Sequence, residues 1–233
     1  MPDLLFLLLK NQVPRHKLHE YRRLEIYLVK YSLIRHLDHF KRNALKRLHN
    51  SYTMALTEST MVKLGSDAPI FNLPDTEGNQ VSLNDFKAET LAVIFTCNHC
   101  PYAKAVEDRL VTLGNEYKGR TDFVLISSND IENYPADSPE MMAEKAKDKN
   151  YPFPYLFDET QEVAKAYSAV CTPDIFLYNK DRKLEYRGRL DDNWQQPHKV
   201  THEDLKMAIE AVLDSNEIEF DQIPSMGCNI KWK

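Results

Sequence analysis

Hydrophobic positions in the middle of the chain change from continuous runs to helical spacing and back again. The runs at residues 91–95 and 123–127 are almost wholly apolar and have the length of buried strands. Between them, apolar residues recur every three or four positions, which predicts one buried face of a helix. A strand, a helix and a second strand in this order predict a right-handed parallel unit. The predicted helix face consists of Tyr102, Val106, Leu110, Leu113 and Tyr117.

Two weaker patterns flank this unit. Residues 68–83 are typical of a hairpin that turns at residues 77–79, Glu-Gly-Asn. Ser138 followed by Pro139 predicts the start of an inserted helix, because serine is a good N-cap and proline is accepted at the first helical position.

The second half of the chain continues with short elements. Residues 154–158 form a strand candidate, and residues 159–168 have helical spacing. Residues 175–188 are typical of an antiparallel hairpin around a charged turn. Residues 201–213 predict a last helix, with Thr201 as its N-cap.

The order of these elements indicates the fold class. A parallel unit, an inserted helix and strand, another helix, and a final hairpin with a helix predict an α/β fold. We expect a mixed central sheet with helices on both faces, in one compact domain at about residues 62–214. The last segment, DQIPSMGCNIKWK at 221–233, is predicted to be an irregular tail.

Charge divides the chain near residue 53. Residues 1–53 carry 11 Lys and Arg against 4 Asp and Glu, whereas the rest carries 19 against 31. Such asymmetry is typical of an extension joined to a domain, so we separate a basic N-terminal extension, 1–53, from a domain with its tail, 54–233. Residues 24–48 have the spacing of a basic amphipathic helix. We favour the alternative, a solvated or disordered leader.

The apolar runs also bear on location. None of them approaches the roughly 18 residues of a membrane span. The run LLFLLL at 4–9 follows Asp3 and precedes no small-residue cleavage site, which makes it a poor signal peptide. We expect a cytoplasmic protein with no nucleic-acid partner, although the basic extension leaves an organellar address open. Only that extension would contact a membrane.

Four cysteines are too few for a disulfide framework in 233 residues. Two of them, Cys97 and Cys100, stand where the first strand gives way to the helix. Unpaired N–H groups at a helix N-terminus stabilise a thiolate and lower its pKa from about 8.5 to between about 3.5 and 7.5. His99 adds a donor or a positive charge near Cys97. The segment therefore predicts a redox-active dithiol in which His99 stabilises the Cys97 thiolate.

Two other interpretations of the pair fit the sequence less well. Cys97 and Cys100 could be inert buried residues, but inert cysteines seldom occupy a helix N-terminus beside a histidine. A zinc site could use Cys97, His99, Cys100 and Cys171. Adjacent His99 and Cys100 do not suit a tetrahedral site on one helical turn, and the chain has no second Cys-x-x-Cys. We therefore expect no metal.

Several motifs resemble known families. The segments FTCNHCPY (95–102) and CTPD (171–174), with the strand order, resemble the thioredoxin-like superfamily. The opening GSDAPIFNLPDTEGNQVSL (65–83) and the inserted helix and strand resemble its redoxin, or AhpC/TSA-like, branch. The ending GCNIKWK (227–233) is similar to the group called peroxiredoxin-like 1, whose members carry Cys-x-x-Cys. The resemblance spans about residues 62–233.

The resemblance implies a three-layer thioredoxin-like fold with a peroxiredoxin-type inserted helix and strand. It also implies a thiol–disulfide oxidoreductase in which Cys97 attacks a substrate disulfide and Cys100 resolves the mixed disulfide. Thr172 and a cis Pro173, together with Asn98, would bind an extended substrate. The substrates would be protein or small-molecule disulfides, reset by a cellular thiol reductant, with no dissociable cofactor.

Two further functions stay open. One is a thiol-dependent peroxidase of antioxidant type using Cys100 or Cys97. If Cys100 attacked peroxide, the family's helper Thr and Pro positions would hold Cys97 and Val93, and its arginine position would fall at 172–174, Thr-Pro-Asp. The other is a non-enzymatic metal-binding or redox-sensing module. Possible extra thiols are Cys171, for which we favour a buried apolar cysteine, and Cys228, for which we favour a packed or exposed one.

Overall fold

Two parallel strands and the helix between them organise the fold. The computed structural model describes residues 56–233, so our predictions for residues 1–53 lie outside the described part. Strand β4 (Thr90–Phe95) pairs in parallel with β5 (Thr121–Ser127), and α3 (Pro101–Glu116) connects them. Every residue of β4 is buried, as its uninterrupted apolar run requires. The predicted parallel unit is confirmed.

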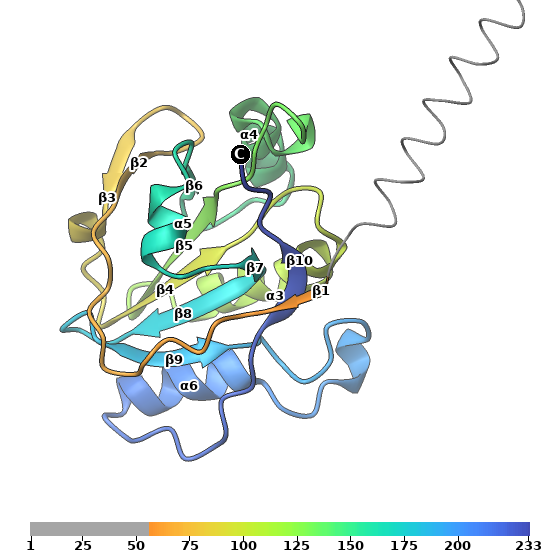
Figure 1. Cartoon of the computed structure of the whole chain (residues 1–233). Coiled ribbons are helices and arrows are strands. Elements are labelled where there is room, and N and C mark those ends of the chain that lie inside the picture. Colours follow the sequence, from red (N-terminus) through yellow and green to blue (C-terminus); the bar gives the residue numbers. More distant parts are fainter. Residues whose placement is uncertain (1–55) are drawn as a thin grey trace, which may run out of the picture. The chain divides into compact units, whose positions relative to one another are not determined.

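These strands lie inside a five-stranded mixed sheet of order β6-β5-β4-β8-β9 (Figure 1). Strand β6 (Tyr155–Phe157) extends the parallel half. Strands β8 (Asp174–Tyr178) and β9 (Leu184–Gly188) form the predicted hairpin and pair antiparallel on the other side of β4. The sheet is therefore mixed, as expected.

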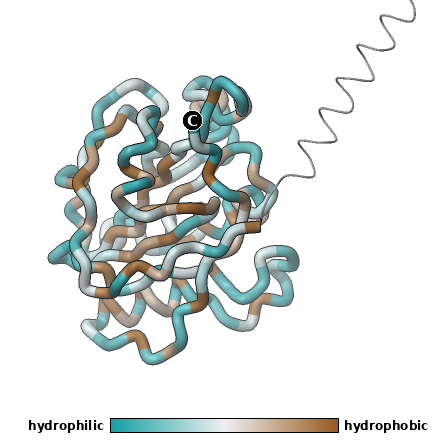
Figure 2. The backbone as a smooth tube through the Cα atoms, viewed as in Figure 1, coloured by the Kyte–Doolittle hydropathy of each residue, from teal (hydrophilic) through white to brown (hydrophobic). Residues whose placement is uncertain are grey.

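Side chains of β4 alternate between the two faces of the sheet. Ala92 and Ile94 enter one apolar core, which α3, α4 (Pro139–Asp148) and α6 (Asp204–Leu213) cover. Ser138 caps α4, as predicted: its hydroxyl accepts from Met141 N. Figure 2 shows hydrophobic positions concentrated along the central strands and hydrophilic ones in the outer loops.

The opposite face of the sheet has its own core, built on Leu91, Val93 and Phe95. Helix α5 (Glu162–Ala166) covers it together with the predicted hairpin. The hairpin is formed by the strands β2 (Asn72–Pro74) and β3 (Gln80–Ser82). Helices on both faces confirm the three-layer arrangement.

One predicted helix boundary is wrong. Helix α6 begins at Asp204 with Glu203 as its N-cap, not at Thr201. Asp192 accepts hydrogen bonds from both the backbone N–H and the hydroxyl of Thr201. Because this contact holds the threonine in the preceding loop, its hydroxyl is not available to the first turn of the helix.

The prediction of an irregular C-terminal tail is also wrong. Strand β10 (Met226–Asn229) lies between β1 (Leu56–Glu58) and β7 (Cys171–Thr172) and pairs antiparallel with both (Figure 1). A segment of four residues, one of them glycine, carries no strand periodicity, so its neighbours decide its structure. This small sheet brings the C-terminal segment to the end of β4 and the start of α3.

Within the described residues, no helix is long and apolar enough to cross a membrane.

Candidate redox site

The two cysteines of the Cys-x-x-Cys segment occupy different local structures. Cys100 is the N-cap of α3 and is followed by Pro101, whereas Cys97 lies in the short connection from β4. The peptide between Thr172 and Pro173 is cis, as predicted.

Both sulfurs meet at Thr172. The Sγ atom of Cys97 lies 3.6 Å from Thr172 Oγ1, and Sγ of Cys100 lies 3.1 Å from the Thr172 carbonyl oxygen. Cys97 is 2 % exposed and Cys100 is 0 % exposed. The predicted loop therefore faces the predicted pair, in a site shielded from solvent.

A third thiol belongs to the same cluster. Cys228 of β10 is 1 % exposed and packs with Cys97, Cys100 and Ala103. Its sulfur is hydrogen-bonded to that of Cys100. We had favoured a packed or exposed role for Cys228, and it is packed directly against the redox pair.

These contacts shift the pKa values of the two thiols in opposite directions, and Cys100 becomes the more acidic one. Hydrogen bonds from Cys228 and then from Cys97 lower the pKa of the Cys100 thiol. The Thr172 carbonyl opposes this, since it can only accept from the protonated thiol. The pKa of Cys97 is raised by its hydrogen bond to Cys100, by burial and by the negative charge of Asp137. We had expected the more acidic thiol at Cys97.

His99 is held by Asp137, a residue that was not predicted from the sequence. Its Nδ1 atom lies 2.6 Å from Oδ2 of Asp137 and 3.8 Å from Sγ of Cys97. The imidazole ring also stacks on Tyr134 at 5.2 Å between ring centroids. The shorter contact orients Nδ1 toward the carboxylate, so the aspartate offsets the predicted effect of His99 on the Cys97 thiolate.

Asp137 is fully buried and organises the connection between β4 and α3. Its Oδ1 accepts from the backbone N–H groups of Asn98 and His99, at 2.8 and 3.1 Å. Its Oδ2 accepts from His99 and from the Asn129 amide, 2.8 Å away. Burial alone would raise the pKa of Asp137, but hydrogen bonds and charge from His99, with the bonds from Asn129 and Asn98, lower it. Its only sequence signal is an aspartate in a proline-rich turn.

The same geometry bears on metal binding. In the part of the chain that the structure describes, one cluster of possible ligands is compact: Cys97, His99 and Asp137, whose ligand atoms lie within 4.8 Å of one another. Both Asp137 oxygens already accept two hydrogen bonds each, which fills their lone pairs. A metal ion would have to break these bonds, so the donor set fits an ion poorly.

Asn98, which we expect to contact substrate, has internal partners for its side chain. Its amide nitrogen donates to the Ala136 carbonyl at 3.0 Å, and its amide oxygen accepts from the Tyr155 hydroxyl at 3.2 Å. Because both ends of the side chain are bonded inside the protein, Asn98 fixes the connection between β4 and α3.

Cys171 lies apart from the thiol cluster. Its Sγ atom contacts the carbonyl oxygens of Pro173, at 3.5 Å, and Ser225, at 4.0 Å. Burial and the nearby Asp174 raise its pKa. These contacts are those of a packed thiol, which is the role that we favoured.

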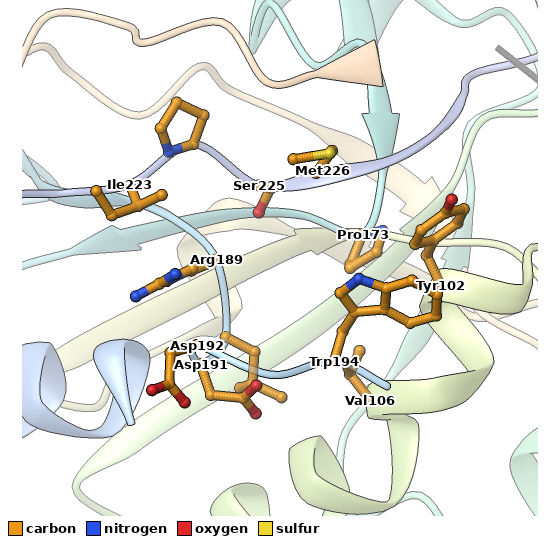
Figure 3. Close-up of a pocket in the computed structure, with 12 residues that line it drawn as sticks. Tyr102, Val106, Pro173, Arg189, Asp191, Asp192, Trp194, Ile223, Ser225 and Met226 are labelled. Carbon is orange, nitrogen blue, oxygen red and sulfur yellow. The ribbon is translucent and has the colours of Figure 1, made fainter. Parts of the chain in front are cut away.

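An open cavity of about 210 Å³ adjoins Pro173 (Figure 3). Two rings form its wall beside the proline: Tyr102 and Trp194, whose centroids are 4.3 Å apart. Met226, the first residue of β10, lines it as well. The cavity gives an approach to the loop that contacts both sulfurs, with aromatic rings beside Pro173 and the charged side chains of Arg189, Asp191 and Asp192 further along its wall.

Comparison with known proteins agrees with this arrangement. The AhpC/TSA family model matches residues 64–187. The chain belongs to the AhpC/TSA family. This confirms the redoxin branch of the thioredoxin-like superfamily, and the chain is an oxidoreductase with thiol–disulfide or peroxiredoxin-like activity.

Three relatives show the range of this family. An uncharacterized conserved protein from Geobacillus kaustophilus has a crystal structure with a TM-score of 0.73 and 49 % identity, covering 77 % of this chain and 97 % of that one. The thiol-disulfide oxidoreductase ResA of Bacillus thuringiensis is 25 % identical over 134 residues, 57 % of this chain and 73 % of its own. Peroxiredoxin Bcp of Escherichia coli K12 is 28 % identical over 106 residues, 46 % and 64 % of the two chains. These relatives include both a thiol-disulfide oxidoreductase and a peroxiredoxin, so the assignment of one of these activities depends on the geometry of the site.

Proposed function

We propose that this AhpC/TSA family member is a thiol–disulfide oxidoreductase with Cys97 and Cys100 as its redox pair. The observation that carries the proposal is that both sulfurs are hydrogen-bonded to each other and to Thr172, at the N-terminus of α3. A hydrogen-bonded dithiol in this position is suited to closing a disulfide and to sharing one proton.

Cys97 is the sulfur that meets the substrate, since it keeps some exposure and Cys100 keeps none. Cys100 starts as the thiolate, which its lowered pKa favours. When Cys97 attacks the substrate disulfide, its proton passes along the S–H···S contact to Cys100, which becomes the thiol. One substrate sulfur leaves as a thiolate, and the other stays bonded to Cys97 as a mixed disulfide.

Cys100 then completes the exchange. Its thiol gives its proton to the departed substrate thiolate, directly or through water, and its sulfur attacks Sγ of Cys97. The second substrate sulfur leaves, and the Cys97–Cys100 disulfide holds the two oxidising equivalents of the substrate. A thiol reductant returns the pair to the reduced state by the reverse exchange.

Peroxide reduction is the less favoured activity. The helper positions that family resemblance gives to Pro and Thr hold Val93 and Cys97, and Val93 is a fully buried strand residue. The position expected for a peroxide-polarising arginine falls at Thr172-Pro173-Asp174. Asp174 is buried there, and its carboxyl group is either neutral or negative, so it cannot supply the missing positive charge.

The backbone edge of β7 limits how a substrate binds. We had expected an extended substrate to pair with Thr172, but β10 of the same chain already pairs there. The cavity beside Pro173 offers a different route, so we propose that the site takes small disulfides or disulfides on a protruding side chain.

Single-cysteine variants test this function. We expect Cys97→Ser and Cys100→Ser each to abolish turnover in a disulfide-reduction assay, and Cys100→Ser to trap substrate on Cys97 as a mixed disulfide. Peroxide consumption measured in parallel should stay near background for the unmodified protein. Full disulfide-reduction activity in both variants would overturn the proposal.

A further inference from the structure

We propose that Cys228 is a third redox-active thiol, which forms a disulfide with Cys100 after the Cys97–Cys100 pair has been oxidised. The inference rests on the proposed function, because the substrate disulfide of that reaction supplies the oxidising equivalents.

The ladder of the small sheet places Cys228 beside the pair. In the antiparallel register of β10 with β7, Cys228 lies opposite Thr172. The Cys100 sulfur lies 3.1 Å from the carbonyl oxygen of the same threonine. The two cysteines thus approach one backbone position from two elements, and their side chains pack together.

Gly227 permits this close approach. A Cβ atom built on Gly227 would lie 2.0 Å from the Thr172 carbonyl oxygen, a distance that no side chain can occupy. Any larger residue at position 227 would therefore push β10 away from β7. The glycine is the residue that lets Cys228 reach the start of α3.

The rest of the C-terminal segment holds β10 in place. Ile230 N donates to Val170 O at 2.9 Å, and Lys231 N donates to Asn129 Oδ1 at 2.8 Å. Gln161 donates to Lys231 O at 2.9 Å. Because the segment is anchored on both the sheet and the loops, Cys228 has a high effective concentration at Cys100.

Cys171 is a matched contrast on the neighbouring strand. It is buried as completely as Cys228, but its sulfur faces the carbonyl oxygens of Pro173 and Ser225. Burial and position in the same small sheet are therefore shared, and contact with the redox pair is the difference between the two thiols.

The proposed step is an exchange of one disulfide for another. Cys228 loses its proton and attacks Sγ of Cys100 in the Cys97–Cys100 disulfide. The bond between Sγ97 and Sγ100 breaks as the bond between Sγ100 and Sγ228 forms. Cys97 leaves as a thiolate and takes up a proton, so the step neither consumes nor releases electrons. Cys97 is then free while the oxidising equivalents lie between α3 and β10.

Disulfide mapping tests this step. The full chain is oxidised with one equivalent of a small-molecule disulfide, quenched in acid, alkylated in denaturant and digested with trypsin. Cys97 and Cys100 share the tryptic peptide 88–104, and Cys228 lies in 207–231. We expect peptide 88–104 linked to 207–231, with Cys97 alkylated. Cys171, in peptide 166–180, should be alkylated throughout.

Three variants sharpen the test. Cys100→Ser should give no linked peptides, which assigns the bond to Cys100. Cys228→Ser should form only the disulfide within peptide 88–104. Gly227→Val keeps every thiol and should reduce the yield of linked peptides at least about fivefold, since it moves β10 from β7. Cys171→Ser is the matched control and should map like the unmodified protein.

Two failures are distinguishable. If the disulfide within 88–104 forms but Cys228 is alkylated in every oxidised sample, the third thiol is overturned and the proposed function stands. If Cys97→Ser and Cys100→Ser both retain disulfide exchange, the proposed function and the role of the third thiol are both overturned.

Discussion

The Nδ1 atom of His99 lies between two acceptors of unequal strength, with Asp137 Oδ2 at 2.6 Å and Cys97 Sγ at 3.8 Å. The carboxylate takes the shorter contact. It also accepts from the backbone N–H groups of Asn98 and His99, the two residues between the cysteines. Asp137 therefore sets both the shape of the Cys-x-x-Cys segment and the charge near Cys97.

Replacing Asp137 should make Cys97 more acidic. The negative charge of Asp137 contributes to the raised pKa of Cys97. Asp137→Asn keeps an oxygen for the loop N–H groups but removes that charge. In a Cys100→Ser background, we expect the Cys97 pKa, measured from the pH dependence of alkylation, to fall. Asp130→Asn, in the same loop, is the control; an unchanged Cys97 pKa in Asp137→Asn would contradict the expectation.

Loosening the C-terminal segment should expose the buried thiols. The Gln161 amide donates to Ser128 O at 2.7 Å and Lys231 O at 2.9 Å, and its oxygen accepts from Lys233 N at 2.9 Å. Gln161→Ala removes all three bonds and costs about 1–3 kcal/mol for the buried Ser128 carbonyl that it leaves unsatisfied, whereas Lys231 O keeps its bond from Asp130 N. We expect Cys97 and Cys100 of the folded variant to be alkylated at least about threefold faster than in the unmodified protein. Tryptic cleavage after Lys231 should also be faster. The exposed Gln196→Ala should behave like the unmodified protein, and equal rates for Gln161→Ala would show that the tail does not shield the site.

The cavity beside Pro173 should determine substrate affinity. Trp194 packs on Tyr102 there, and its removal opens the wall of the cavity. We expect Trp194→Ala to raise KM for a small disulfide about tenfold while kcat falls less, because the side chain contacts the substrate and not the sulfurs. Trp232→Ala removes the other tryptophan, which is outside the cavity, and should leave KM unchanged. A Trp194→Ala enzyme with normal KM would show that substrate enters elsewhere.

Asp174 should make the protein less stable as the pH rises. Burial raises its pKa from the usual 3.8 to about 7. Between these values the native state keeps a proton that the unfolded state has lost. Stability therefore falls with increasing pH through this range and levels off above about 7. At about 1.4 kcal/mol per pKa unit, the full effect is at most roughly 4 kcal/mol.

The Asp174→Asn variant removes this titration. We measure the free energy of unfolding by urea denaturation. We expect the value for the variant minus that for the unmodified protein to increase as the pH rises from 4 to about 7. At pH 4 the two should be nearly equal. Asp214→Asn, an exposed substitution, is the control. A stability difference that does not change with pH would contradict the assignment.

The sequence predicted the elements whose signals are local. The apolar runs of β4 and β5, the helical spacing of α3 and the Ser138 N-cap each depend on neighbouring residues only, and all are present. Cys97, Cys100 and the Thr172–Pro173 loop could be proposed as one site because the fold class brings these positions together.

What the sequence did not predict depends on contacts between distant residues. Asp137 reaches the Cys-x-x-Cys segment from 38 residues away, and nothing in its own turn indicates a partner. The acidity of the pair follows from Cys228, more than a hundred residues further on. Thr201 has the residue type of an N-cap, but Asp192 uses its hydroxyl first.

The position of β1 has a practical consequence for shortened forms of the protein. Leu56–Glu58 covers the outer edge of β10, so a protein beginning after Glu58 would leave that edge with unpaired N–H and C=O groups. Exposed strand edges pair readily with other chains. We expect such a truncated protein to self-associate through the strand that carries Cys228, joining two redox sites edge to edge.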